Sequence, residues 1–267
     1  MIRGSMPSDG GYLIMSKEEK EEIISAHPEV GHIIKGYMGA DDFLSSIDRY
    51  CLWMNEDDYN QYGHIEPVKQ RMDGVKQSRL ASNTPSTQEY AQYPYMFRQP
   101  QYIELDSIIV PSTSSERREY VPIGFLDKNI VVSNSAYVVY GADMLLFAIL
   151  TSKMHNVWMR IVCGRMKTDY RYTNTLCYNT FPFPKINNEQ KERLSALAEN
   201  ILLTRENHTE MTLGEMYNPE SMPQDLKYAH QAMDIAVEQC YRPEPFTSDE
   251  ERLEYLFKLY EKMTKKK

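Results

Sequence analysis

The segment from Gly164 to Asn174, GRMKTDYRYTN, carries side chains suited to reading nucleic-acid bases. Lys167 and Asp169 stand two residues apart, so in extended backbone they project from the same side. A lysine donates to the O6 and N7 atoms of guanine, and an aspartate accepts from the N4 amino group of cytosine. One such pair can therefore address both bases of a G·C pair in the major groove. Arg171 continues the same side and has donors for a purine or a phosphate.

The alternative interpretation of this pair is a surface ion pair between Lys167 and Asp169. Such a pair contributes little to stability, typically under about 1 kcal/mol. Lys153 to Arg171 holds five basic residues against one acid, which creates a local field that attracts phosphate but is also typical of a solvated helix end.

Charge along the chain shows that any anion-binding surface must be local. The 267 residues carry 30 basic and 38 acidic side chains, a net charge of −8, which excludes a globally basic protein. Residues 1–64 hold 5 basic and 12 acidic residues (−7), residues 65–184 hold 13 and 10 (+3), and residues 185–267 hold 12 and 16 (−4). The middle third is therefore the part suited to a polyanion.

Two further segments offer donors for phosphate. The run from Ser112 to Arg118, STSSERR, has the hydroxyls of Ser114 and Ser115 followed by Arg117 and Arg118. A helix is predicted over Glu66 to Leu80, with basic side chains outside its apolar face. Two of them, Lys69 and Arg71, are candidate phosphate donors. Arg165 joins the same set from the first segment.

Catalytic chemistry is not predicted for this chain. None of its 12 glycines forms the GxG of a dinucleotide or S-adenosylmethionine loop, and NTFPF at Asn179 to Phe183 lacks the first proline of the Asn-Pro-Pro-aromatic motif of amino-methyltransferases. The histidines and four cysteines have no metal-ligand spacing, so no metal site is predicted. Few, widely spaced cysteines predict a reducing, cytoplasmic setting, and the longest apolar stretch, Met144 to Leu150, is too short to span a membrane.

The first part of the chain alternates helices, strands and a long loop. A capping box of Ser16 and Glu19 predicts a helix over residues 16–27, and residues 48–54 (DRYCLWM) predict a buried strand. Val68, Met72, Val75 and Arg79 recur at three- and four-residue spacing after Pro67, which predicts a helix over residues 66–80. Residues 82–101 have no period and predict a long loop.

The rest of the chain predicts a small sheet followed by helices. Strands are expected over residues 102–110, 119–123 and 130–140, and one or two helices over residues 143–163. Helical periodicity then dominates residues 189–205, 226–241 and 249–263. The predicted fold class is α+β, a mixed domain of small sheets and helices followed by an all-helical C-terminal domain.

Several long strings in the sequence resemble one known family. They are RYCLWM at Arg49 to Met54, SSERREYVPIGFL at Ser114 to Leu126, ILTSKMHNVWMRIVCGRMKTDYRYTNTLCYNTFPFP at Ile149 to Pro184, and LGEMYNPESMPQDLKYAH at Leu213 to His230. PxxDGGxLI near the start and ERLEYLFKLYEKMT near the end add to them. In this order and spacing they resemble the C-terminal part of MmeI-like type IIL restriction–modification enzymes.

The resemblance implies a division of the chain and a function. Residues 7–184 would be a target recognition domain for a short double-stranded DNA sequence, and residues 185–267 a helical domain. Residues 1–6 resemble the artificial N-terminal extension of a recombinant protein, so we expect them to lie outside the fold and the chain to be an excised fragment. An N6-adenine methyltransferase domain and a nuclease domain, with S-adenosylmethionine and Mg²⁺ as their cofactors, would lie upstream in the same polypeptide, and this part would carry no cofactor.

The resemblance also assigns base-reading positions. Lys167 and Asp169 would be a coupled pair that reads one G·C pair, and Arg171 with Asn134 and Ser135 would address an inner base pair. Thr173 stands where the family usually has a serine, and it keeps the hydroxyl.

Two other function classes stay open at this point. A net charge of −8 and 20 tyrosines are compatible with a protein-interaction module that does not bind DNA. The other is a standalone enzyme with an unrecognised site, although the sequence shows no cofactor loop, metal-ligand cluster or catalytic triad.

Overall fold

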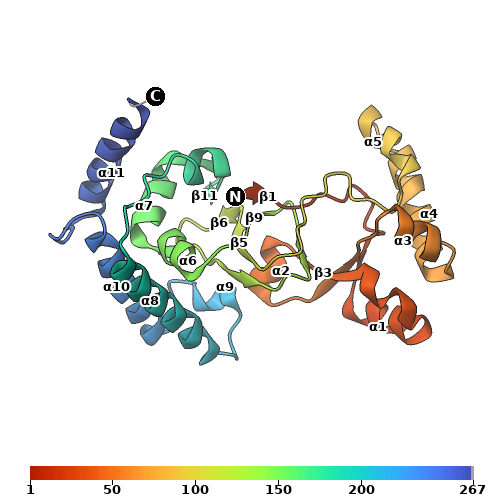
Figure 1. The fold of residues 1–267 in the computed structure, drawn as a ribbon, viewed down its shortest axis with the longest axis horizontal. Coiled ribbons are helices and arrows are strands. Elements are labelled where there is room, and N and C mark those ends of the chain that lie inside the picture. Colours follow the sequence, from red (N-terminus) through yellow and green to blue (C-terminus); the bar gives the residue numbers. More distant parts are fainter. Residues whose placement is uncertain (266–267) are drawn as a thin grey trace. The chain divides into compact units, whose positions relative to one another are not determined.

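The computed structural model describes residues 1–265 and has the predicted α+β class, with helices and three small sheets (Figure 1). Its contacts divide the chain into two compact units. We call Ile2–Asp106 with Leu126–Val138 the N-terminal unit, and Ser107–Phe125 with the chain from Val139 onward, joined by Met1, the helical unit. None of the helices in the described residues is long and apolar enough to cross a membrane.

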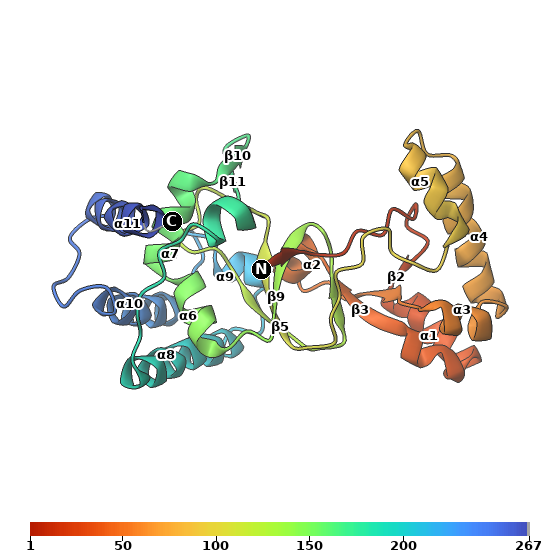
Figure 2. The ribbon, with the colours of Figure 1, turned by 45° about the horizontal axis from the view of Figure 1, so that its top comes forward.

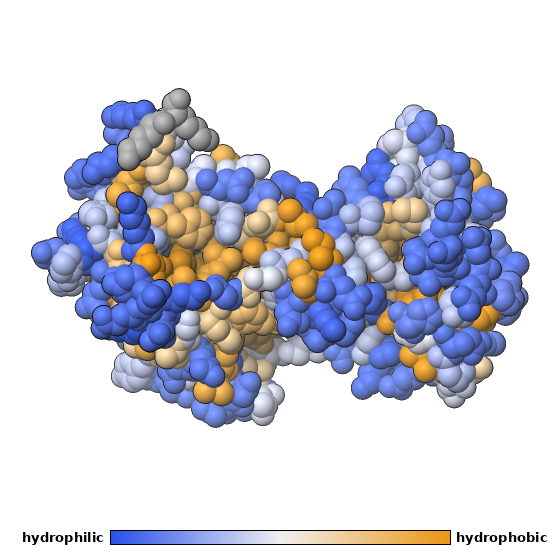
Figure 3. Space-filling model, in the orientation of Figure 1, coloured by the Kyte–Doolittle hydropathy of each residue, from blue (hydrophilic) through white to orange (hydrophobic). Residues whose placement is uncertain are grey.

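The N-terminal unit is built on a four-stranded sheet in the order β2 (Ile14–Met15), β4 (Arg49–Leu52), β3 (Ile34–Met38) and β8 (Ile130–Val132). β4 pairs antiparallel with both neighbours, whereas β3 and β8 are parallel with Gly36 opposite Ile130. Leu13, Val30, Cys51, Leu52, Val68, Val75 and Val131 lie at the centre of its core, all fully buried. The visible face of this unit is mostly hydrophilic (Figure 3).

Short helices surround this sheet. They are α1 (Lys17–Ala26), η1 (Pro28–Ile33), α2 (Ala40–Ser45), α3 (Glu56–Tyr62), α4 (Glu66–Leu80), α5 (Pro85–Glu89) and η2 (Tyr90–Gln92). The predicted capping box of α1 is present, because Ser16 accepts from the Glu19 N–H and Glu19 accepts from the Ser16 N–H. α4 is observed as predicted and buries Val68, Met72 and Val75, and it also buries Arg79, which local spacing did not indicate.

The Arg79 side chain is the main polar anchor of the N-terminal unit. It is 1% exposed, and its guanidinium donates to five backbone carbonyls, those of Pro7, Ser8, Tyr90, Tyr93 and Met96. These carbonyls lie on two segments with no regular strand pairing between them. Arg79 therefore fixes the start of the chain against the segment that follows α5.

Residues 1–6 are not an extension outside the fold, contrary to the sequence prediction. β1 (Ile2–Arg3) pairs antiparallel with β9 (Ala136–Tyr140), with Ile2 opposite Val138. Ser5 is buried and its N–H donates to Val132 O over 2.7 Å. A Cβ at Gly4 would stand 2.3 Å from Ser133 O, so the strand approaches this backbone closely.

The helical unit combines short strands with long helices. β5 (Ser107–Pro111) is neighbour to β7 (Gly124–Leu126) in a second sheet, and β6 (Thr113–Ser114) belongs to a third. The helices are α6 (Met144–Thr151), α7 (Lys153–Val162), α8 (Asn188–Glu206), α9 (Leu213–Met216), α10 (Gln224–Gln239) and α11 (Asp249–Thr264). α8 and α10 lie side by side in both ribbon views (Figures 1 and 2).

A buried polar network centred on Asp234 joins α10 to the start of α7. Asp234 accepts hydrogen bonds from the Tyr120 hydroxyl (2.7 Å) and from the Lys153 N–H (2.6 Å). The Tyr120 ring stacks on His230 at 4.2 Å, and the His230 Nε2 lies 2.6 Å from the Tyr217 hydroxyl. Burial raises the pKa of Asp234 to about 7, partly opposed by these hydrogen bonds.

Several predicted elements differ from those observed. The expected loop over residues 82–101 contains α5 and η2, and residues 119–123 form no strand. The expected strand over residues 130–140 is interrupted by a turn at residues 133–135, which separates β8 from β9. The expected strand over residues 102–110 is confined to β5, which begins only at Ser107.

Replacement of Arg79 by Met should destabilise the protein by about 3 to 5 kcal/mol, because five part-buried carbonyls lose their donor. Urea unfolding followed by circular dichroism measures this change. Arg98, which donates only to the exposed Ser86 hydroxyl among the described residues, is the matched control. Arg98→Met should cost about 1 kcal/mol or less, and an equal loss in both variants would contradict the anchoring role.

The raised pKa of Asp234 predicts a pH-dependent stability. A carboxyl whose folded pKa lies above its unfolded value contributes fully at low pH, and the contribution is lost as pH rises through the folded pKa. Between pH 4 and 8 the wild type should therefore lose up to about 4 kcal/mol relative to Asp234→Asn, given a folded pKa of about 7. The urea midpoints of both proteins, measured across this pH range, give the difference in stability. Taking the difference cancels the opposing titration of the buried histidines, which both proteins share. Parallel curves of stability against pH for the two proteins would refute the prediction.

Candidate nucleic-acid interface

The segment predicted to read bases forms a β-hairpin. β10 (Gly164–Met166) pairs antiparallel with β11 (Asp169–Arg171), and β11 pairs in turn with β6, with Tyr170 opposite Ser114. Figure 2 shows β10 and β11 extending from the end of α7 away from the helices of the same unit. The predicted segment and the first part of the STSSERR run, Thr113–Ser114, thus belong to one three-stranded sheet.

Lys167 does not lie in extended backbone, contrary to the assumption made from its spacing. It is the first of two turn residues between β10 and β11 and has a positive φ of 57°, a conformation uncommon for a lysine. The same-side argument for Lys167 and Asp169 therefore fails, because a tight turn reverses the chain between them. Lys167 instead lies at the exposed tip of the hairpin.

The two faces of β11 carry different side chains. Asp169 and Arg171 lie on one face, two residues apart as predicted, and Tyr170 lies on the other. On that other face the Arg165 guanidinium lies 4.7 Å from the Tyr170 ring and pairs with Glu116 at 3.0 Å. The alternative ion pair between Lys167 and Asp169 is absent from the salt bridges of residues 1–265.

The hairpin carries two exposed cations that have no protein partner within residues 1–265. The side chains of Lys167 and Arg171 are exposed, and neither makes a hydrogen bond or ion pair within residues 1–265. Most other basic side chains named here are bound to carbonyls or carboxylates. Two free cations with an adjacent carboxylate have the donor and acceptor set needed for base edges.

The base of the hairpin is anchored in the core by Tyr172. This residue is buried, its N–H donates to Ser112 O over 2.9 Å, and its hydroxyl lies 2.9 Å from His155 Nε2. Burial lowers the pKa of His155 to about 3, so the ring is neutral at physiological pH. His155 is therefore a packed residue that positions the hairpin.

The STSSERR run forms a turn beside the hairpin. Arg117 forms a hydrogen bond and ion pair with Glu220, and Ser115 accepts from the Arg117 N–H at 3.3 Å. Arg118 is half-buried, and burial lowers its pKa while the nearby Asp169 charge partly restores it. Together with Gly214, Asn218 and Pro219, these three residues line a shallow cavity of about 130 Å³.

Ser114 is a poor phosphate donor. It is 5% exposed, and its hydroxyl has no partner among the described residues. Its backbone pairs with Tyr170 instead. Ser114 thus supports the hairpin from below and does not present its hydroxyl to solvent.

Asn134 and Ser135 lie in the N-terminal unit, on the turn between β8 and β9. The Ser135 hydroxyl accepts from the Ala40 N–H at the start of α2 over 2.9 Å. The Arg3 guanidinium donates to Asn134 O over 2.9 Å. This turn is thus held on both sides by its own unit, separately from the 164–171 hairpin.

The two basic residues of α4 behave differently. Lys69 is exposed and pairs with Asp73 at 3.2 Å, a contact that raises the pKa of Lys69. Arg71 donates to Tyr12 O and Ile14 O and pairs with Glu19 at 2.7 Å. Its guanidinium is committed to holding α4 against α1 and β2, so phosphate binding by Arg71 is not supported.

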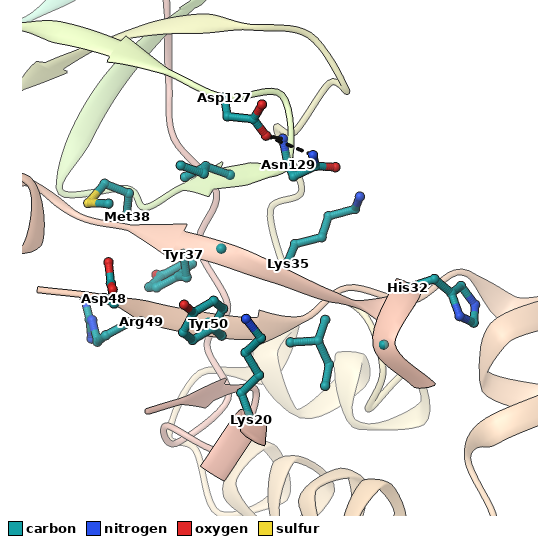
Figure 4. A pocket seen from close by; sticks show the side chains of 14 residues that line it. Lys20, His32, Lys35, Tyr37, Met38, Asp48, Arg49, Tyr50, Asp127 and Asn129 are labelled. Carbon is teal, nitrogen blue, oxygen red and sulfur yellow. Dashed lines mark hydrogen bonds between the residues drawn. The ribbon is translucent and has the colours of Figure 1, made fainter. Parts of the chain in front are cut away.

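Sequence reasoning missed a polar cleft in the N-terminal unit (Figure 4). It has a volume of about 460 Å³ and lies over β3 and β4. The Lys20 ammonium lies 3.9 Å from the Tyr50 ring, Lys35 pairs with Glu104 at 3.7 Å, and Arg49 pairs with Asp42. The residues of β3 show no clear alternation in the sequence, so local spacing did not indicate that these side chains meet. All three cations have partners, which weakens the cleft as an anion site.

No metal centre is found in the described part of the chain, where no three histidine, cysteine or carboxylate side chains gather.

Two family models match the chain. Residues 1–185 match the model described as "MmeI, target recognition domain", and residues 186–266 match "MmeI, C-terminal domain". Together they extend over nearly the whole sequence.

Individual relatives agree with these matches. The chain is 41% identical over 263 residues to "DNA methyltransferase A" of Bacillus subtilis (strain 168), covering 98% of this chain and 30% of that protein. A structure described as the type IIL restriction–modification enzyme MmeI in complex with DNA superposes with a TM-score of 0.93 at 35% identity, covering 99% of this chain and 35% of that one. The chain thus spans about a third of the length of these relatives.

Proposed function

Because the chain belongs to the MmeI target-recognition-domain family, we propose that it is a module that reads a short sequence in double-stranded DNA. The similarity to a DNA-bound relative supports this proposal. The observation that carries it is the 164–171 hairpin, with two exposed cations that have no partner in residues 1–265 and an acceptor between them. A two-stranded ribbon of this kind fits the major groove, where base edges are distinguishable.

Lys167, Asp169 and Arg171 are the proposed base readers. Lys167 at the tip donates to guanine, and Asp169 at the start of β11 accepts from cytosine. The proposal for this pair therefore rests on the exposed position of Lys167 at the hairpin tip. It does not require Lys167 and Asp169 to project from the same side of an extended strand. Arg171 and, in the N-terminal unit, Asn134 and Ser135 are further proposed base readers.

Backbone contacts are proposed for Arg165, Ser115, Arg117, Arg118 and Lys69. The Arg118 guanidinium faces a cavity and makes no hydrogen bond within residues 1–265, so it is the strongest of these candidates. Arg117 and Arg165 must exchange Glu220 and Glu116 for phosphate. Arg71 and Ser114 are not part of this set, because the Arg71 guanidinium binds backbone carbonyls and Ser114 is buried.

The chain is proposed to act as a non-catalytic part of a longer cytoplasmic polypeptide. Its relatives are about three times its length, and one is named a DNA methyltransferase. An upstream N6-adenine methyltransferase domain using S-adenosylmethionine, and a Mg²⁺-dependent nuclease domain, are then partners in the same polypeptide. A domain boundary near residue 184 remains part of this proposal.

Substitution of Lys167 by Ala should relax discrimination at one base pair by about 1 to 3 kcal/mol, since one bidentate contact is lost. Duplexes bound from a randomised library are sequenced for the wild type and the variant. The wild type should show a preferred base at this position, and Lys167→Ala should show none there while the other positions keep theirs.

The matched control is Arg117→Ala, which should weaken binding to all sequences alike because phosphate carries no base information. If Lys167→Ala lost the preferred base at every position, or kept the wild-type preferred sequence unchanged, the residue that reads this base pair would lie elsewhere. A library without any preferred sequence in the wild type would contradict the proposed function itself.

Salt dependence separates the DNA module from a protein-interaction module. Each phosphate neutralised by a cation lowers the slope of log affinity against log salt by about 0.9. Anisotropy titrations with a labelled duplex at several salt concentrations should give a steep negative slope of log affinity against log salt. Arg118→Ala should make this slope less negative by about one. A flat line would favour an apolar protein interface.

A further inference from the structure

Two cysteines flank the hairpin at its base. Cys163 directly follows α7 and precedes β10, and Cys177 lies in η3 (Asn174–Tyr178), the single helical turn after β11. The pairing of Gly164 with Arg171 places Cys163 beside the chain that leads to Cys177. The Thr173 N–H donates to Cys177 Sγ over 3.4 Å.

The two thiols interact with each other and differ in accessibility. The pKa of the Cys163 thiol is lowered, first by its hydrogen bond with Cys177 and further by the backbone of Arg171 and the charge of Arg165. The same contact and burial raise the pKa of Cys177. Cys163 is partly exposed, whereas Cys177 is fully buried.

This combination differs from that of the other two cysteines. Cys51 is fully buried, and burial raises its pKa. Cys240 is partly exposed like Cys163, but burial raises its pKa. Each of these two thiols donates to a neighbour one helical turn earlier, Cys240 to Ala236 O over 3.3 Å and Cys163 to Met159 Sδ over 3.6 Å, so the pKa and the neighbouring second thiol are what distinguish Cys163. An accessible thiol with a lowered pKa beside a second thiol is the arrangement found in reversible thiol–disulfide sites.

We propose that Cys163 and Cys177 are a dithiol site that reacts with low-molecular-weight disulfides and closes an intrachain disulfide at the base of the hairpin. Cys163 is the attacking thiol and Cys177 the resolving one. This site is independent of the proposed DNA-reading function, since it depends only on the two thiols and their surroundings.

The chemistry is a two-step exchange. The Cys163 thiolate attacks one sulfur of the small disulfide, whose S–S bond breaks, and one thiolate leaves with the bonding electrons. That thiolate takes the proton of Cys177, which then attacks the Cys163 sulfur and expels the second small thiolate. Two protein thiols are oxidised by two electrons, and the small disulfide is reduced to two thiols.

The resulting bond ties both ends of the hairpin together. It links the end of α7 to the turn after β11, on either side of Lys167 and Arg171. Figure 2 shows that β10 and β11 follow α7 without another element between them. Oxidation therefore acts on the segment whose exposed cations have no protein partner.

The test uses oxidised glutathione as the probe. The 267-residue protein is incubated with it at mildly alkaline pH, quenched with acid, denatured, alkylated and digested. Mass spectrometry should find the Cys163 and Cys177 peptides joined, with Cys51 and Cys240 alkylated. Cys163 should be consumed about tenfold or more faster than Cys240, because it has the larger thiolate fraction.

Variants separate the two roles. Cys177→Ser should trap glutathione on Cys163, Cys163→Ser should leave Cys177 unreacted, and Cys240→Ser should behave as the wild type. Circular dichroism checks that each variant is folded, and the wild-type linkage needs no variant. A persistent glutathione adduct on wild-type Cys163, or equal consumption of Cys240, would overturn the proposal.

Discussion

The position of the hairpin depends on a buried carboxylate in a different part of the sequence. Asp234 on α10 binds the Lys153 N–H, the first backbone donor of α7, and the Tyr120 hydroxyl near STSSERR. A carboxylate at a helix N-terminus satisfies a donor that the helix cannot use and complements its dipole. Because α7 leads directly into β10, α10 determines where the hairpin begins. The C-terminal helices thus support the site although they supply none of its proposed base readers.

Buried and exposed polar groups have different tasks in this protein. Arg79 and Arg71 spend their donors on backbone carbonyls and a carboxylate, and each holds segments that share no strand pairing. Such groups must be satisfied internally, because a buried unpaired donor is costly. Lys167 and Arg171 are solvated instead, so leaving them unpaired costs little. The same residue types therefore stabilise the fold at one position and remain available for a ligand at another.

The sequence predicted periodic elements well and irregular ones poorly. The α1 capping box and the apolar positions Val68, Met72 and Val75 of α4 followed from local spacing, whereas the burial of Arg79 did not. The turn at residues 133–135 did not, because Ser133, Asn134 and Ser135 lie between two runs that read as one strand. The tip position of Lys167 was also missed, since a two-residue turn with a lysine at positive φ has no glycine to mark it. The base-reading candidates stay predictions, but their geometry had to come from the structure.

An acidic chain that reads DNA is physically consistent. Nonspecific affinity arises from phosphate neutralisation and depends on the number of free cations. Here Arg117 and Arg165 are paired with Glu220 and Glu116, so each phosphate contact replaces an existing ion pair and gains little. Two unpaired cations, Lys167 and Arg171, lie instead on the ribbon that the proposal places at base edges. This distribution lowers the affinity for arbitrary sequences more than the affinity for the correct sequence. The ratio of these two affinities, rather than the affinity for the correct sequence alone, determines specificity among many competing sites.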